Sequence, residues 1–292
     1  MNRYKYLSIS LLFALSVILV AAGGAQAQSA PPATQKPATT SNESAATSSR
    51  PALEPKALEV LKTSSDRLAA AHTLAFTAVE TYETPSRQGH PLVLANKSEV
   101  TLQRPDKLRV ITPGDGPAIE FYYDGKTMMA LAPTENLLAV ADAPPTIDAT
   151  LEAAYHASGT YFPFTDLIVA DPYKDWAPGA VLAYYVGQSH IVGGTTTDIV
   201  AYVGDGVFEE VWIGVEDKLP LLVHAVYLDD PDQIRHNLML SNWRLDLAVP
   251  ADAFAPSNAA NAKRIPFAHP HPEPTTATKN PATRTRSTTT PQ

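Results

Sequence analysis

The chain has 292 residues, no cysteine and a formal net charge of −8. Without cysteine it has no disulfides, no thiol nucleophile and no cysteine-based zinc site. Between residues 51 and 262, 28 Asp and Glu residues outnumber 13 Lys and Arg residues, a net charge of −15. Such an acidic body argues against binding nucleic acid or an anionic membrane surface, and we interpret it as a solvated surface.

The first 27 residues have the pattern of a secretory signal peptide. Arg3 and Lys5 precede an apolar run, and Ala25-Gln26-Ala27 fits a small-x-small cleavage site. The run is shorter than the roughly 20 residues of a transmembrane helix, and no cysteine follows it for lipid attachment. We therefore expect cleavage after Ala27, a periplasmic location and no stable membrane anchor in the mature protein.

Two further segments have too few large apolar residues to form a core. Residues 28–50 and 269–292 are rich in Ala, Ser, Thr and Pro, and we predict a disordered linker and a disordered tail. The remaining residues, 51–268, are predicted to form one domain.

The domain begins with a helix and continues with strands. Apolar residues at helical spacing predict a helix over 55–71, with Pro55 in its first turn. Period-two alternation then predicts strands over 73–83, 94–104 and 107–113.

The stretch 119–133 is predicted to be a β-hairpin around Asp124-Gly125-Lys126. A three-residue loop would place Phe121, Tyr123, Met129 and Leu131 on one face of the hairpin. The opposite face would still carry apolar residues, so each face needs a cover.

A strand over 136–144 follows, and then a helix over 146–159 that begins at an N-cap Thr146 and ends at Gly159. The apolar segment 160–176 is predicted to be a loop that contains a short helix. Turn signals then separate five more strands, 180–194, 195–206, 207–215, 219–228 and 237–247. This order predicts an α+β fold with one strongly curved antiparallel sheet of about ten strands and helices on one side.

No catalytic motif stands out. Gly187-Gln-Ser189-His190-Ile191 is close to a nucleophile elbow, but Ile191 replaces the second glycine and no helix follows. A hydrolase that uses Ser189 and His190 is therefore a remote alternative. The histidines are scattered, and Asp229, Asp230 and Asp232 read as a solvated turn, so we predict neither a metal site nor a cofactor.

Aromatic and apolar residues on both strand faces are the strongest functional signal. They fit either an ordinary core with helical cover or an apolar pocket beneath a helical lid. For the pocket, the candidate ligand-binding residues are Phe121, Tyr123, Met129, Leu131, Tyr155, Phe162, Phe164 and Trp212.

Several stretches carry a family resemblance. They include Asp124-Gly125-Lys126, the Ala143–Asp148 segment "APPTID" and the closing segment Val249-Pro250-x-Asp252-x-Phe254. Over residues 58–267 the chain resembles a family of predicted periplasmic proteins without assigned function, similar to a branch of the LolA/LolB-like lipoprotein-carrier superfamily. The resemblance implies a half-open barrel that wraps a helix, with helical segments closing an apolar cavity that takes acyl chains in the carriers.

Two classes of function follow. The first is a non-catalytic periplasmic binding protein for an apolar ligand: a lipid, an acyl chain or a lipidated peptide or protein. The alternative is an envelope protein–protein interaction or stress-sensor module.

Overall fold

The structure, a computed structural model, describes residues 52–114 and 117–269. The expected signal peptide, the expected linker and residues 270–292 of the expected tail lie outside the described residues. Within the described part, no helix is both long and apolar enough to cross a membrane.

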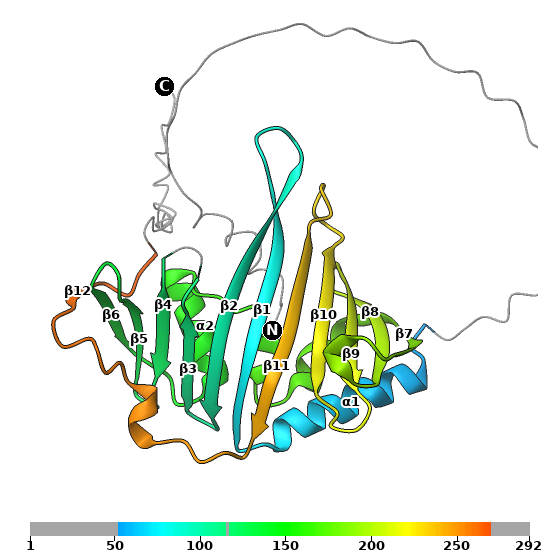
Figure 1. Ribbon diagram of the computed structural model, residues 1–292, viewed down its shortest axis with the longest axis horizontal. Coiled ribbons are helices and arrows are strands. Elements are labelled where there is room, and N and C mark those ends of the chain that lie inside the picture. The colour runs from blue at the N-terminus through cyan, green and yellow to red at the C-terminus, as the bar shows by residue number, and fades with distance from the viewer. Residues whose placement is uncertain (1–51, 115–116, 270–292) are drawn as a thin grey trace, which may run out of the picture.

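Twelve strands form one curved, unclosed sheet (Figure 1) in the order β12-β6-β5-β4-β3-β2-β1-β11-β10-β9-β8-β7. All neighbouring strands are antiparallel except β12 and β6, which are parallel. The first six strands are β1 (Thr73–Pro85), β2 (Pro91–Gln103), β3 (Lys107–Thr112), β4 (Ile119–Tyr123), β5 (Thr127–Ala132) and β6 (Leu137–Asp142). The others are β7 (Ala180–Ser189), β8 (Thr197–Gly204), β9 (Val207–Gly214), β10 (Pro220–Tyr227), β11 (Arg235–Leu245) and β12 (Lys263–Ile265).

The predicted α+β class and the antiparallel sheet are confirmed, but the sheet has twelve strands where about ten were expected. The prediction did not include β12, a three-residue strand with all its residues exposed. Such a strand has no alternation of apolar and polar residues from which to predict it.

Two helices match the sequence closely. Helix α1 (Pro55–Ala70) has proline in its first turn, as expected. Helix α2 (Ile147–Ser158) begins where the Thr146 hydroxyl accepts a hydrogen bond from the Ala149 N–H at 3.3 Å. It ends at Gly159, which has a left-handed φ of 75°.

The apolar segment after α2 contains two short helices where one was expected, α3 (Thr165–Ile168) and α4 (Pro172–Trp176). Pro172 separates them, because proline fits the first turn of a helix but not its interior. The remaining short elements are the 3₁₀ helices η3 (Ala177–Gly179), η4 (Val192–Gly194) and η5 (Ala251–Phe254).

Helices α1 and α2 lie on the same face of the sheet (Figure 1), which we call the helix face. Helix α1 packs over β7 and β8 through a small cluster that includes Ala57, Leu61 and Val200. A larger cluster includes residues of α2, α3 and strands β1 to β5.

The β4–β5 hairpin has a different register from the one predicted. Phe121 pairs with Ala130, and Tyr123 pairs with Met128. Four residues, 124–127, therefore separate the last paired positions of the two strands. The Asp124 N–H donates to the Thr127 carbonyl at 3.3 Å, which leaves only Gly125 and Lys126 at the tip. A shift of one residue moves every side chain of a strand to the other face. Met129 and Leu131 therefore lie on one face of the hairpin, and Phe121 and Tyr123 lie on the other.

The second apolar face of this hairpin is covered by the C-terminal segment, residues 246–269, which we call the strap, and we call this side of the sheet the strap face. It crosses the sheet on the side away from α2 (Figure 1), and η5 packs against β3. Phe254 in η5 is 1% exposed, and Tyr122, Leu131 and Leu138 on this face are buried. The strap therefore closes a second, smaller apolar layer.

Candidate functional site

A row of aromatic rings joins the helix face of the sheet to the segment that covers it. Phe121 of β4 lies 5.3 Å from Phe162, measured between ring centroids, and Phe162 lies 5.6 Å from Phe164. Phe164 in turn lies 5.5 Å from Phe76 of β1, and Phe76 lies 4.4 Å from Trp243 of β11. Two of these five rings, Phe162 and Phe164, belong to the connection between α2 and α3.

We call residues 146–170 the lid segment, because they lie over the helix face of the sheet. Its α2 contributes Ile147, Leu151 and Ala154 to the same buried cluster as Phe121 and Phe164. Phe162 is only half-buried and packs at the margin of that cluster. The lid segment thus supplies both a buried ring, Phe164, and a half-buried ring, Phe162.

Four of the eight predicted ligand-binding residues belong to this arrangement. Phe121, Tyr123 and Phe164 are buried in the core, and Phe162 packs against them. The phenol of Tyr123 donates to the Pro144 carbonyl at 2.5 Å, which ties β4 to the start of the lid segment. A fifth predicted residue, Tyr155, is a half-buried residue of α2 whose ring lies 5.6 Å from that of His156.

Three predicted residues face the other side of the sheet and do not join this cluster. Met129 pairs with Tyr122 and Leu131 pairs with Leu138, beneath the strap face. Trp212 alternates with Val211 and Ile213, whose side chains pack under α1, so its ring points away from the helices. The grouping failed because face assignment depends on exact register, which the apolar composition of these strands does not fix.

One end of the lid segment is fixed to the sheet by polar contacts. The Ile147 N–H donates to the Pro105 carbonyl at 2.9 Å. The Asp148 carboxylate accepts from the Ala170 N–H at 3.1 and 3.2 Å, which closes the lid segment on itself. Arg104, at the end of β2, donates from Nη1 to the Ile168 carbonyl at 3.0 Å.

The other end of the lid segment meets the strap. The His269 N–H donates to the Ala157 carbonyl at 2.8 Å, near the C-terminus of α2. Phe267, two residues earlier, packs against the main apolar cluster. The strap therefore crosses one face of the sheet and then contacts the lid segment on the other.

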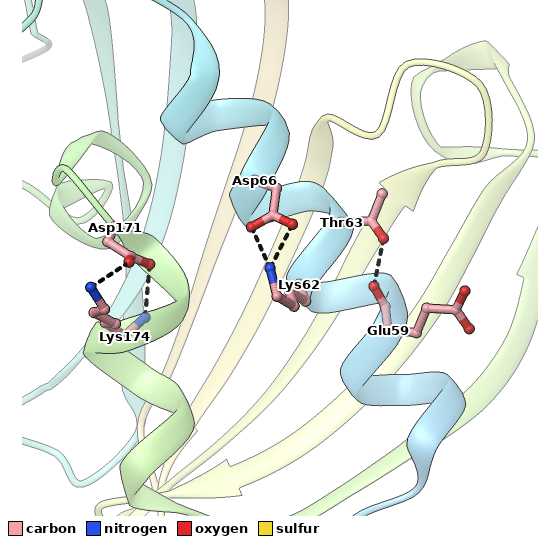
Figure 2. Close-up of polar contacts among 6 residues, drawn as sticks. All are labelled: Glu59, Lys62, Thr63, Asp66, Asp171 and Lys174. Carbon is pink, nitrogen blue, oxygen red and sulfur yellow. Dashed lines mark hydrogen bonds and ion pairs between the residues drawn. The ribbon is translucent and has the colours of Figure 1, made fainter.

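The helices α1 and α4 meet beside the lid segment along an exposed, charged surface. Figure 2 shows the Lys62–Asp66 pair, with Nζ and Oδ2 2.6 Å apart, and the Lys174–Asp171 pair at 3.2 Å. Asp171 also accepts from the Lys174 N–H at 3.1 Å and so caps α4. Exposed pairs of this kind contribute at most about 1 kcal/mol and mark a solvated face.

Sequence reasoning missed Phe76, Trp243 and Arg104 as members of the site. Phe76 follows the alternation of its strand, so a strand assignment could have placed it on the core face. The Trp243 indole donates to the Pro220 carbonyl at 2.9 Å, and Arg104 bonds to a residue 64 positions away. Neither contact has a local sequence signal.

The hydrolase alternative has no matching geometry. The Ser189 hydroxyl accepts a hydrogen bond from the Ile191 N–H at 3.3 Å, while His190 Nδ1 lies 3.0 Å from the Thr196 hydroxyl. Catalysis by this pair would need the imidazole bonded to the serine hydroxyl. Among the residues that the structure describes, no group of three or more His, Asp and Glu side chains could hold a metal ion.

The comparisons with known proteins identify a family. The family described as "Predicted periplasmic protein (DUF2092)" matches residues 57–268, and the chain belongs to it. This confirms the resemblance found in the sequence, and the family description agrees with the expected periplasmic location. A comparison with curated proteins gives no match.

Several solved structures are similar to this chain. LprF from Mycobacterium bovis is 17% identical, with 68% of this chain and 97% of that chain covered and a TM-score of 0.42. The MucA/MucB complex from Pseudomonas aeruginosa gives 17% identity, 72% and 64% coverage and a TM-score of 0.39. The LolA superfamily protein NE2245 from Nitrosomonas europaea gives 10% identity, 68% and 97% coverage and a TM-score of 0.32.

Proposed function

We propose that this protein is a non-catalytic periplasmic binding protein for an apolar ligand, such as a lipid, an acyl chain or a lipidated peptide. The ligand would lie between the helix face of the sheet and the lid segment. The observation that carries the proposal is the aromatic row, because Phe162 and Phe164 belong to the cover and the rings on either side of them belong to the sheet.

Binding requires the lid segment to move. Phe121, Tyr123 and Phe164 are buried against one another, so a ligand must take the place of contacts that they make with the cover. The polar contacts of Ile147, Asp148 and Arg104 hold one end of the cover, whereas the other end has the backbone bond from His269. We therefore place the hinge near Ile147 and the opening near Gly159.

The energy of binding would come from apolar contact. Each acyl carbon buried against these rings contributes about 0.8 kcal/mol, so a long chain can offset the loss of the side-chain contacts that it replaces. A polar ligand would gain no such binding free energy from contact with the aromatic side chains.

The direct test is binding of a neutral apolar fluorophore, N-phenyl-1-naphthylamine, to the full-length exported protein. Fluorescence should rise on binding, and Phe162→Ala should weaken the affinity about tenfold through lost apolar contact. Met239→Ala is the matched control, because Met239 is 49% exposed and pairs with Val79 and Leu222 on the face away from the lid segment.

Native mass spectrometry of protein purified from the periplasm is the second measurement. Co-purifying lipid would support the proposal. Ligand-free protein that also leaves the fluorophore unbound would refute it.

A second candidate function, an envelope interaction module, is favoured by the edge strand β7. Residues 52–54 already form an isolated parallel β-bridge there, between Leu53 and Ala183, with the Glu54 N–H donating to the Ala183 carbonyl at 2.8 Å. Farther along, Val186 and Ile191 are 47% and 85% exposed. An extended segment of a partner protein would pair with this part of the edge. A photo-crosslinker at Val186 should then capture one partner in cells, and the same crosslinker at Val93 should not.

A further inference from the structure

Arg104 is a cationic side chain on the inner side of the fold. It comes directly after β2, and its Nη1 donates a hydrogen bond to the Ile168 carbonyl of α3 at 3.0 Å. Its guanidinium therefore lies between the end of β2 and the end of the lid segment.

Two of its three guanidinium nitrogens have no partner among the described residues. These nitrogens, Nε and Nη2, are buried and donate to no acceptor within hydrogen-bonding distance. Together they carry three N–H donors. A buried donor without a partner costs about 1–3 kcal/mol, and more when the group is charged, so this arrangement needs an explanation.

Asp148 is the acidic residue whose charge acts on Arg104, but it does not supply the missing bonds. Its carboxylate is engaged by the Ala170 N–H, and it forms no ion pair with Arg104 within 4.0 Å. Burial lowers the pKa of Arg104 and Asp148 partly offsets this effect, yet an arginine stays protonated in proteins.

The two free nitrogens lie on one edge of the guanidinium. Nε–H and one N–H of Nη2 point in the same direction, and this edge binds a carboxylate or phosphate through two parallel hydrogen bonds. The third nitrogen, Nη1, is bonded to Ile168 and fixes the orientation of the fork.

The fork also lies near Phe164, the central ring of the aromatic row. Phe164 is the N-cap residue of α3, and Ile168 is its last residue. Four residues of helix rise about 6 Å, so the guanidinium contacts the lid segment roughly one turn beyond the ring of Phe164. A chain that lies along the aromatic rings would bring its head group to this position.

We infer that the ligand is an amphiphile with an acidic head, a carboxylate or a phosphate ester, on a single apolar chain. The head accepts two hydrogen bonds from Nε and Nη2 of Arg104, and the chain packs along Phe164, Phe162 and Phe121. This inference rests on the proposed function, and it adds the chemical class of the head group.

The experiment compares ligands that share one chain and differ in the head: dodecanoic acid, dodecyl phosphate and 1-dodecanol. Each displaces N-phenyl-1-naphthylamine from the full-length protein, below its aggregation concentration and at a pH where the acids are ionised. At least one acid should bind about tenfold or more tightly than the alcohol, as two charge-assisted hydrogen bonds predict. The two acidic ligands distinguish a carboxylate from a phosphate head.

Arg104→Gln should remove this preference, so that the acids and the alcohol bind with similar affinity. Arg104→Lys keeps the positive charge but lacks the two parallel N–H donors, so it should retain only part of the preference for the acid. If the glutamine variant does not fold, the lysine variant tests the role of Arg104 in its place. Arg109→Gln is the matched control, because Arg109 pairs with Tyr122 on the strap face and should keep the full preference.

The outcomes distinguish the inference about the acidic head group from the proposed function. Equal binding of acid and alcohol by the unaltered protein, or an acid preference that survives in both Arg104 variants, would overturn the acidic head and leave the apolar site standing. Failure of all three ligands to bind would overturn the proposed function itself.

Discussion

Asp124 shows at the scale of single residues how a side chain sets the register of a strand. Its carboxylate accepts from the Lys126 N–H at 2.9 Å, the Thr127 N–H at 2.8 Å and the Thr127 hydroxyl at 3.1 Å. These bonds hold the turn so that Asp124 and Thr127 close it. The predicted three-residue loop was therefore wrong, and Met129 and Leu131 moved to the opposite face.

The same carboxylate gives a prediction about pH. Burial alone would raise the pKa of Asp124, but the N–H and hydroxyl bonds outweigh burial and lower it. Its stabilising effect is thus complete above the unfolded-state pKa and is lost as the pH falls through the lower folded-state pKa. Asp124→Asn should cost about 1 kcal/mol of unfolding free energy at pH 7 and much less at pH 3.

Urea unfolding at the two pH values measures this difference. Asp142→Asn is the control, because the Asp142 side chain is exposed and makes no hydrogen bond within the described part of the chain. An equal cost of Asp124→Asn at both pH values would contradict the role of the charged carboxylate.

In the proposed function, helix α2 is the element that would govern access to the site, and its C-terminal end is the informative part. Gly159 has a φ of 75°, and a Cβ placed there would lie 3.1 Å from the His269 ring. The residue thus serves two purposes: it ends the helix and lets the strap approach the lid segment.

Gly159→Ala should destabilise the protein by more than about 1 kcal/mol, since the backbone strain and the contact with His269 add. Gly89→Ala is the matched control, because Gly89 has a φ of 83° and nothing within 4 Å of the added Cβ. The two variants share the backbone cost, so the difference between their unfolding midpoints reports the strap contact. Identical midpoints would mean that the strap does not hold the lid segment.

At the scale of the whole molecule, the sheet separates two apolar layers with different covers. The lid segment and α1 cover the helix face, and the strap covers the opposite face of the β3–β6 region (Figure 1). The lid segment adds no strand to the sheet, whereas the strap adds a strand, β12. In the proposed binding mode, the movable cover is therefore the one on the helix face.

Phe254 tests the structural role of the strap. Phe254→Ala should lower the unfolding free energy by about 3–5 kcal/mol, because it leaves a cavity at a side chain that is 1% exposed. Ile265→Ala, at a position that is 39% exposed on the same segment, should change it by well under 1 kcal/mol. Denaturant unfolding compares them, and a small effect of Phe254→Ala would show that the strap is not part of the core.

The sequence by itself determined the α+β class, the positions of most strands along the chain and both ends of α2. These features depend on neighbouring residues: alternation in the strands, the Thr146 hydroxyl that accepts from Ala149 three residues away, and the glycine that follows the last turn. The aromatic residues of the lid segment were also recognised, since an apolar run outside a strand is visible in composition.

Only the tertiary structure decided which faces these residues share and what covers each face. Met129, Leu131 and Trp212 left the predicted site because register, a non-local property, sets the direction of every side chain in a strand. Phe76, Trp243 and Arg104 joined it through partners far away in the chain, as when Arg104 bonds to Ile168. Such contacts arise only when the chain has folded, because the energy of packing distant segments together outweighs local preference.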